Sequence, residues 1–141
     1  MRNRWAIFLA AALAQTTFAS PATKNAEVNG VVSMEAENFT AQTGYVRVGN
    51  ANASGGAAMR ADGGSDSKLD FRFTVRQAGT WYVWIRAYAT ANENNGFRLG
   101  LDGAVKGDIY MKKVGWSWTP EWLRGESHSG PITLNLTAGT H

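Results

Sequence analysis

The sequence predicts an all-β fold, a β-sandwich or jelly roll, and three observations support this class. From residue 31 onward the chain consists of short β-rich runs. The segments between these runs are rich in glycine, asparagine, aspartate and serine, which are the residues that tight turns use. No run places apolar residues at the helical period. About eight short strands with this spacing are typical of sandwiches and jelly rolls.

The strands are predicted in order along the chain, each bounded by turn residues. Turns are expected at residues 53–56, 62–65, 77–79, 92–96 and 102–103, where glycine pairs or Asx residues stand together. The predicted strands between them cover residues 31–37, 45–48, 57–60, 68–76, 80–89, 97–102, 105–110 and 132–137. We therefore expect a chain of hairpins rather than helices that alternate with strands.

Two of these strands can be assigned faces, because side chains alternate along a strand. The strand over 68–76 has one apolar face, formed by Leu69, Phe71, Phe73 and Val75. The strand over 80–89 has an equally apolar face, formed by Trp81, Val83, Ile85 and Ala87. Its opposite face is unusual, because it carries large side chains with polar tips: Tyr82, Trp84, Arg86 and Tyr88. Such a row is either a second packing layer or a ligand surface.

The first 19 residues are predicted to be a signal peptide. Arg2 and Arg4 give a basic start, residues 5–14 form an apolar stretch too short to span a bilayer, and the small-residue site ends at Ala19. Residues 20–30 are expected to be a polar linker and residues 31–141 a single β-sandwich module. The protein is therefore expected to be secreted, into the periplasm or the extracellular medium.

Composition restricts the function. Without Arg2 and Arg4 the chain keeps 12 of its 14 basic side chains against 11 acidic ones, a balance that gives no ground for a nucleic-acid or membrane partner. Cysteine is absent, so a secreted domain of this size must rely on its core or on a bound metal. The sequence contains no H-E-x-x-H, G-x-S-x-G or phosphate-binding motif, which argues against an enzyme.

Five segments in order resemble carbohydrate-binding modules of families 6 and 35. They are MEAENF at 34–39, GTWYVWIR at 79–86, LDG at 101–103, WSW at 116–118 and LTAGTH at 136–141. The resemblance implies a galactose-binding-like jelly roll that binds a polysaccharide without catalysis. Such modules act as monomers tethered to a secreted glycoside hydrolase or polysaccharide lyase. They continue with a further strand after the Gly-Thr-His turn, so we expect this copy to lack its last strand.

Glu35 and Glu37 are the first candidate site. On a strand their carboxylates would lie on one face and repel each other unless solvent or a cation separates them. Calcium, which takes six to eight oxygen ligands, would suit an exported domain, and two exposed glutamates are the alternative. The resemblance implies a structural calcium ion at these positions. Asp70 and the carbonyls near Gly55 are further candidate ligands.

The second candidate site is aromatic. Trp116, Trp118 and Trp122 fall within seven residues around Pro120, so part of this segment is expected to be a loop. Flat rings stack on the C–H faces of sugars, and polar side chains bind the hydroxyl edges. The resemblance implies a sugar site at the sandwich tip between Tyr45 and Trp118 or Trp122, with Trp116 packed inside.

Further residues and two other functions stay open. Asn94 and Asn95 are candidate polar partners at the tip, and the row of Tyr82, Trp84, Arg86 and Tyr88 is a candidate second site on the sheet face, as in some family 6 modules. One alternative is a structural spacer or adhesion domain of a cell-surface protein, with all tryptophans in the core. Another is a small glycan hydrolase that uses the two carboxylates of Glu121 and Glu126.

Overall fold

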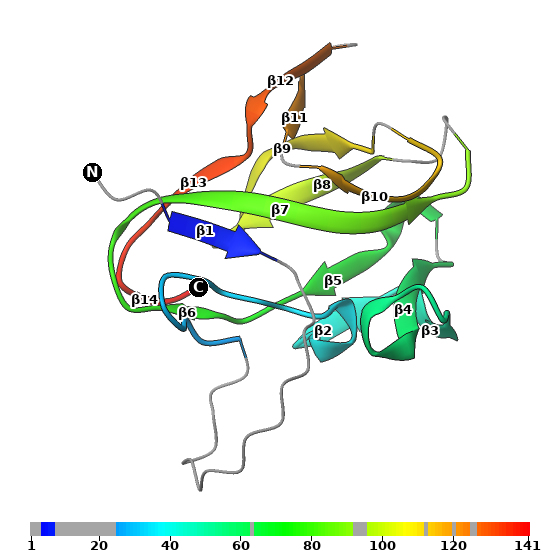
Figure 1. The fold of residues 1–141 in the computed structure, drawn as a ribbon, viewed down its shortest axis with the longest axis horizontal. Coiled ribbons are helices and arrows are strands. Elements are labelled where there is room, and N and C mark those ends of the chain that lie inside the picture. The colour runs from blue at the N-terminus through cyan, green and yellow to red at the C-terminus, as the bar shows by residue number, and fades with distance from the viewer. Residues whose placement is uncertain are drawn as a thin grey trace, which may run out of the picture.

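The computed structural model describes residues 4–7, 25–62, 64–91, 96–111, 113–119, 121–124 and 127–141. Most of these residues lie in strands, and the predicted all-β class is confirmed (Figure 1). Three short 3₁₀ turns interrupt the strands: η1 (Ala36–Asn38), η2 (Ser54–Gly56) and η3 (Gly64–Asp66). The strands are β1 (Arg4–Ile7), β2 (Ala41–Thr43), β3 (Tyr45–Gly49), β4 (Ala57–Ala61), β5 (Lys68–Asp70), β6 (Thr74–Val75), β7 (Gly79–Ala89), β8 (Gly96–Leu101), β9 (Ala104–Tyr110), β10 (Gly115–Thr119), β11 (Glu121–Arg124), β12 (Ser127–Pro131), β13 (Thr133–Leu136) and β14 (Gly139–Thr140).

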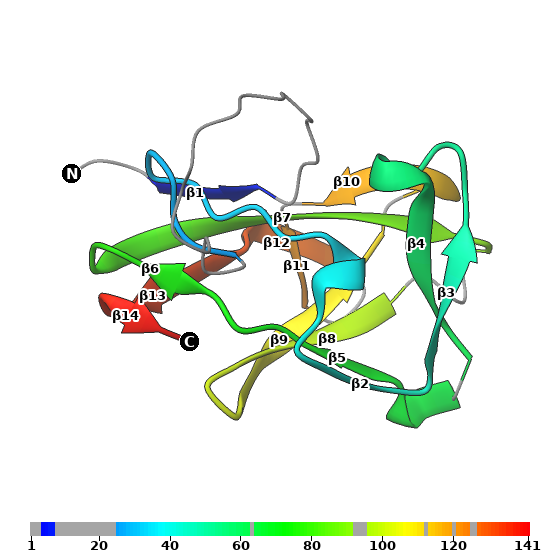
Figure 2. The same cartoon turned by 90° about the horizontal axis from the view of Figure 1, so that it is seen from below.

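Two four-stranded sheets carry most of the pairing among these residues. The first is built on the long strand β7, which pairs with β10 and β13 in antiparallel fashion and with β1 in parallel fashion. The second has the order β12-β11-β9-β8. Three two-stranded pairs complete the fold: β14-β6, β2-β5 and β3-β4. Seen from below, β1, β7 and β10 lie at one level, while β8 and β9 lie at another (Figure 2).

The hydrophobic core joins the two four-stranded sheets. Trp81 and Val83 of β7 are in one cluster with Ile109 of β9 and with Leu134 and Leu136 of β13. Phe97, Leu99 and Leu101 of β8 and Trp122 of β11 pack against this cluster. Trp81 is completely buried, and a buried aromatic side chain of this size dominates the apolar area that a core removes from water. The predicted core face of the 80–89 strand is therefore confirmed at Trp81 and Val83, and Ile85 packs against the cluster.

Two of the predicted strands differ in the structure. Within 31–37, Val32 and Met34 are buried and Ser33 is exposed, so the expected alternation is present. The chain forms no strand there and instead turns at η1, where the Asn38 N–H donates to the Glu35 carbonyl at 2.9 Å. The strand predicted over 68–76 is split into β5, which pairs with β2, and β6, which pairs with β14.

The tryptophan-rich segment is more regular than predicted. Residues 115–119 form β10, which pairs with residues 85–89 of β7, and residues 121–124 form β11 in the other sheet. Pro120, between the two strands, lies outside the described residues. Proline lacks a backbone donor, and for that reason we expected part of this segment to be a loop. The chain instead changes from one sheet to the other at this point.

The N-terminal part of the structure bears on the predicted signal peptide and on the predicted linker. Arg4–Ile7 forms β1, in parallel register with Trp81–Trp84, whereas the rest of the predicted signal peptide lies outside the described residues. Residues 25–30 of the predicted linker are attached to the fold. Glu27 is only 5% exposed, and its Oε2 accepts the Arg76 N–H at 2.6 Å. No helix among the described residues is long and apolar enough to cross a membrane.

His141 is held against the rest of the fold by several contacts. Its backbone pairs with Phe73 in both directions, and its ring stacks on the Phe73 ring at 5.5 Å. Nδ1 lies 2.9 Å from Asp102 Oδ2, and Nε2 lies 2.9 Å from the Thr137 carbonyl. The Thr137 carbonyl raises the pKa of the imidazole, and so does the Asp102 carboxylate, while burial opposes them. Two acceptors on one ring favour the imidazolium, whose nitrogens both donate.

Candidate functional site

The outer side of β7 carries the candidate site. Along this strand Trp81 and Val83 are buried in the core, so the side chains between and beyond them lie on the opposite face. Together with two tryptophans of β10 they form what we call the aromatic face: Tyr82, Trp84, Arg86, Tyr88, Trp116 and Trp118. Tyr88 is 54% exposed, and the other five side chains are half-buried.

Strand β10 widens the aromatic face at one end. In the antiparallel register Trp116 lies opposite Tyr88 and Trp118 opposite Arg86, and directly opposed residues share a face. The Tyr88 and Trp116 rings meet edge to face, with centroids 5.6 Å apart. The Arg86 guanidinium lies over the Trp116 ring, 4.6 Å from its centroid. Trp116, which we expected in the core, is therefore part of the outer face.

The loop between β3 and β4 fixes Arg86 from the other side. Nη2 of Arg86 donates to the carbonyl of Asn52, which lies in this loop, at 3.0 Å. The same loop is attached to the N-terminal part of the chain, because the Ser54 hydroxyl lies 2.8 and 2.9 Å from the two carboxylate oxygens of Glu35. A guanidinium has five N–H donors, and its position here is set by a ring and a carbonyl together. Arg86 is thus a positioned cation in the middle of the face.

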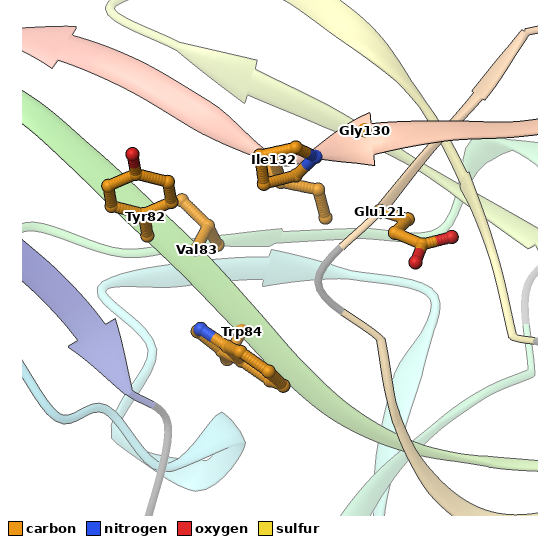
Figure 3. Close-up of a pocket in the computed structure, with 7 residues that line it drawn as sticks. Tyr82, Val83, Trp84, Glu121, Gly130 and Ile132 are labelled. Atoms are coloured by element: carbon orange, nitrogen blue, oxygen red, sulfur yellow. The ribbon is translucent and has the colours of Figure 1, made fainter.

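A pocket of about 340 Å³ opens at the other end of the row. Tyr82 and Trp84 line it from β7, and Glu121 lines it from the first residue of β11. Figure 3 shows both rings along β7 and the Glu121 carboxylate across from them. Val83, Gly130, Pro131 and Ile132 complete the lining. The pocket thus combines two aromatic side chains from one stretch of sequence with a carboxylate from another.

A second groove, of about 570 Å³, lies beside β9. Trp122 covers Gly107 so closely that a Cβ at position 107 would lie 2.8 Å from Cε3 and Cζ3 of the indole. Trp122 is half-buried and packs against the core, so it serves as a packing residue. The lining consists of Leu101, Lys106, Gly107, Asp108, Trp122, Thr133, Leu134 and Asn135.

The described residues predicted for the tip site lie on three strands. Trp118 lies on β10 and belongs to the aromatic face, whereas Trp122 lies on β11 in the other sheet. Tyr45 begins β3, and burial raises the pKa of its phenol. Asn94 and Asn95 lie outside the described residues. The predicted sheet-face row lies along β7 with Trp118 beside it, and the tip site stays a prediction.

The predicted metal ligands lie in different surroundings. Glu35 directly precedes η1 and accepts from Ser54, Glu37 lies within η1, and Asp70 on β5 forms an ion pair with Lys68 at 2.9 Å. Within the described residues no group of three or more acidic, histidine or cysteine side chains comes together to hold a metal. The two glutamates at one turn, the Ser54 hydroxyl and the nearby carbonyls are hard oxygen donors. Their chemistry is compatible with calcium.

Two contributors to the site were not assigned to it from the sequence. Glu121 was named only as a carboxylate of the alternative hydrolase, and in the structure it lines the pocket with Tyr82 and Trp84. Asn52 acts through its backbone carbonyl, for which side-chain patterns carry no signal.

Comparisons with protein families, with curated proteins and with solved structures found no match for this chain.

Proposed function

We propose that this chain is a non-catalytic carbohydrate-binding module and that the aromatic face is its binding site. The observation that carries the proposal is the pocket that two amphipathic rings, Tyr82 and Trp84 of β7, line together with Glu121 of β11. The fold proposed with this function is the galactose-binding-like jelly roll of family 6 and family 35 modules. The two packed four-stranded sheets support it, as do the five ordered sequence segments.

The chemistry of the face matches the two kinds of surface that a sugar presents. The C–H faces of a pyranose are apolar and stack on Trp84 and Tyr82, while the hydroxyl edges donate to a carboxylate such as Glu121. Arg86 adds a donor for hydroxyl oxygens further along. A volume of about 340 Å³ falls at the small end of ligand pockets, which suits one or a few sugar rings. In this proposal Glu121 binds hydroxyl groups and does not transfer protons.

The proposal also covers the location of the module, the enzyme to which it is attached and a bound ion. The basic and apolar start of the chain supports export, and the family resemblance supports attachment to a secreted enzyme that degrades polysaccharides. A structural calcium ion is proposed at Glu35 and Glu37, with the Ser54 hydroxyl and backbone carbonyls of that loop as further ligands. Calcium there would neutralise the two carboxylates and would hold the loop that also positions Arg86.

Affinity electrophoresis against a panel of soluble polysaccharides tests the function. We expect at least one glycan to retard the protein, and we expect Trp84→Ala to weaken this retention by about tenfold or more, as for a central aromatic contact in an interface. Trp122→Ala is the matched comparison, because it removes a tryptophan from the other groove. Circular dichroism and melting curves establish that each variant is folded.

Two results would count against the proposal. Retention by no glycan in the panel would remove carbohydrate binding itself. Retention that a folded Trp84→Ala variant keeps and a folded Trp122→Ala variant loses would move the site to the groove beside β9.

A further inference from the structure

We propose that the edge of β7 from Trp81 to Trp84 is a strand-accepting site, which the N-terminal residues of this chain occupy only until the signal peptide is removed. β1 (Arg4–Ile7) lies on this edge in parallel register with Trp81–Trp84 (Figure 1). The ligand class is therefore an extended peptide segment that adds to the sheet through its backbone. The release of β1 rests on the proposed export, whereas the strand-accepting site does not depend on it.

The geometry of β7 leaves one of its edges to β1. Because β1 and β13 both pair with Trp81 and Tyr82, they lie on opposite edges of β7. The Val83 N–H donates to the Ile132 carbonyl at 2.9 Å, on the side of β13. Successive backbone N–H groups of a strand point to opposite edges, so those of Tyr82 and Trp84 point toward β1. The backbone of β1 thus faces donors of β7 along this stretch.

The pairing of β1 differs from that of the other strands. Among the strands that the structure describes, β1 and β7 form the one parallel pair, and the other pairs are antiparallel. Antiparallel neighbours can be joined by a tight hairpin, whereas parallel neighbours need a long connection. Residues 4–7 therefore reach residues 81–84 from a distant part of the chain, as a separate peptide would.

A second attachment of the N-terminal region lies after the predicted cleavage site at Ala19. The Glu27 N–H donates to the Thr74 carbonyl at 2.9 Å, and the Glu27 carboxylate accepts the Arg76 N–H at 2.6 Å. These contacts remain when residues 1–19 are removed, so the chain that follows stays attached beside β6. Cleavage would therefore take β1 away from the edge of β7 and leave this anchor in place.

The segment seated on the edge shows what kind of peptide the site takes. Its sequence is Arg-Trp-Ala-Ile, in which tryptophan and isoleucine favour the extended conformation. Pairing through the backbone requires N–H donors, so proline within the segment is incompatible with it. A sheet edge that loses its neighbour is a template for another strand. The site therefore fits an extended, proline-free segment that runs parallel to β7.

Disulfide cross-linking of the full chain tests the pairing, because the parent chain has no cysteine. Ala6 lies opposite Val83, and paired strands are about 4.8 Å apart, so Ala6→Cys with Val83→Cys should form a disulfide on mild oxidation. Ala6→Cys with Ala87→Cys is the matched control, since position 87 lies about 13 Å further along β7 and is out of reach. Cross-linking of neither pair, or of both equally, would overturn this register.

Cleavage of the folded chain tests the release. A specific protease site placed after Ala19 allows residues 1–19 to be cut off once the full chain has folded. We expect removal of the cut segment by dialysis to lower the melting temperature by several degrees. A synthetic peptide of residues 2–9 should restore the melting temperature as its concentration rises. The same peptide with Trp5→Pro and Ala6→Pro, which lacks two backbone donors, should not restore it.

The contradicting outcomes separate the parts of the proposal. The strand-accepting site is refuted if the melting temperature is unchanged once residues 1–19 are gone, or if the proline peptide restores it as well as the parent peptide does. An exported protein whose mass still includes residues 1–19 would refute the release alone. Glycan retention by the uncut chain reports on the proposed function separately, because β1 is then in place.

Discussion

Gly107 on β9 is required by the ring that covers it. A Cβ built at this position would lie 2.8 Å from Cε3 and Cζ3 of Trp122, well inside ordinary contact distance. The backbone at Gly107 is not in the left-handed region, so alanine would fit but for the indole. Trp122 packs against the core and cannot withdraw without opening a gap. We expect Gly107→Ala to cost about 1–3 kcal/mol, as overpacking of a core does.

The assay is urea and thermal unfolding of the full chain, followed by tryptophan fluorescence. A destabilisation of this size lowers the melting temperature by several degrees in a domain of this length. Gly100→Ala in the neighbouring strand β8 is the control, because its nearest heavy atom, the Ala104 carbonyl oxygen, would lie at an ordinary 3.5 Å. That variant should stay within about 0.5 kcal/mol of the parent.

A second substitution separates contact with Trp122 from a general effect of alanine in the strand. In a Trp122→Leu background the ring is gone, and Gly107→Ala should then cost much less than it does in the parent chain. The reasoning is refuted if Gly107→Ala leaves the stability unchanged, or if its cost is the same with and without the indole.

Two further predictions concern titration and metal. The pKa of His141 is raised in the folded protein by the Thr137 carbonyl and by Asp102, so its contribution to stability is fully present below about pH 6.5 and is lost as the pH rises through the folded pKa. The melting temperature should therefore fall as the pH rises above about 6.5. Asp102→Asn should make the melting temperature less dependent on pH, and asparagine suits the positive φ of 52° at position 102. If the variant has the same pH dependence as the parent, Asp102 does not contribute in this way. If calcium binds at Glu35 and Glu37, EDTA should lower the melting temperature of the parent and have little effect on Glu35→Gln. An equal response of both proteins, or none in either, would refute the ion at this place.

Much of the fold could be predicted from the sequence, because most of the predicted strands appear where the pattern placed them, although the one over 68–76 is split into β5 and β6. The 80–89 strand is the best case, since Trp81 and Val83 mark its buried face without ambiguity. The segment at 31–37 shows the limit of such patterns. Val32 and Met34 alternate into the core as expected, yet the chain turns at η1 instead of continuing as a strand.

The candidate site was predicted in part. The row on the outer side of β7 could be identified from side-chain type and alternation alone. Its completion by Trp116 and Trp118 depends on the pairing of β10 with β7, a contact between segments about 30 residues apart in sequence. Local patterns do not specify such a register, because several strands of similar length could pair with β7. The hydrogen bond from Arg86 to Asn52 could not be predicted either, since its acceptor is a backbone carbonyl, for which side-chain patterns carry no signal.

Protection of individual tryptophans from oxidative labelling, with and without a retained polysaccharide, tests the central proposal most directly. If the aromatic face binds the glycan, Trp84 becomes protected in the complex. Trp81, which is completely buried, should react little in either state and so reports that the protein stays folded. Unchanged labelling of Trp84 at a saturating concentration of a glycan that binds would contradict the assignment of this face as the binding site.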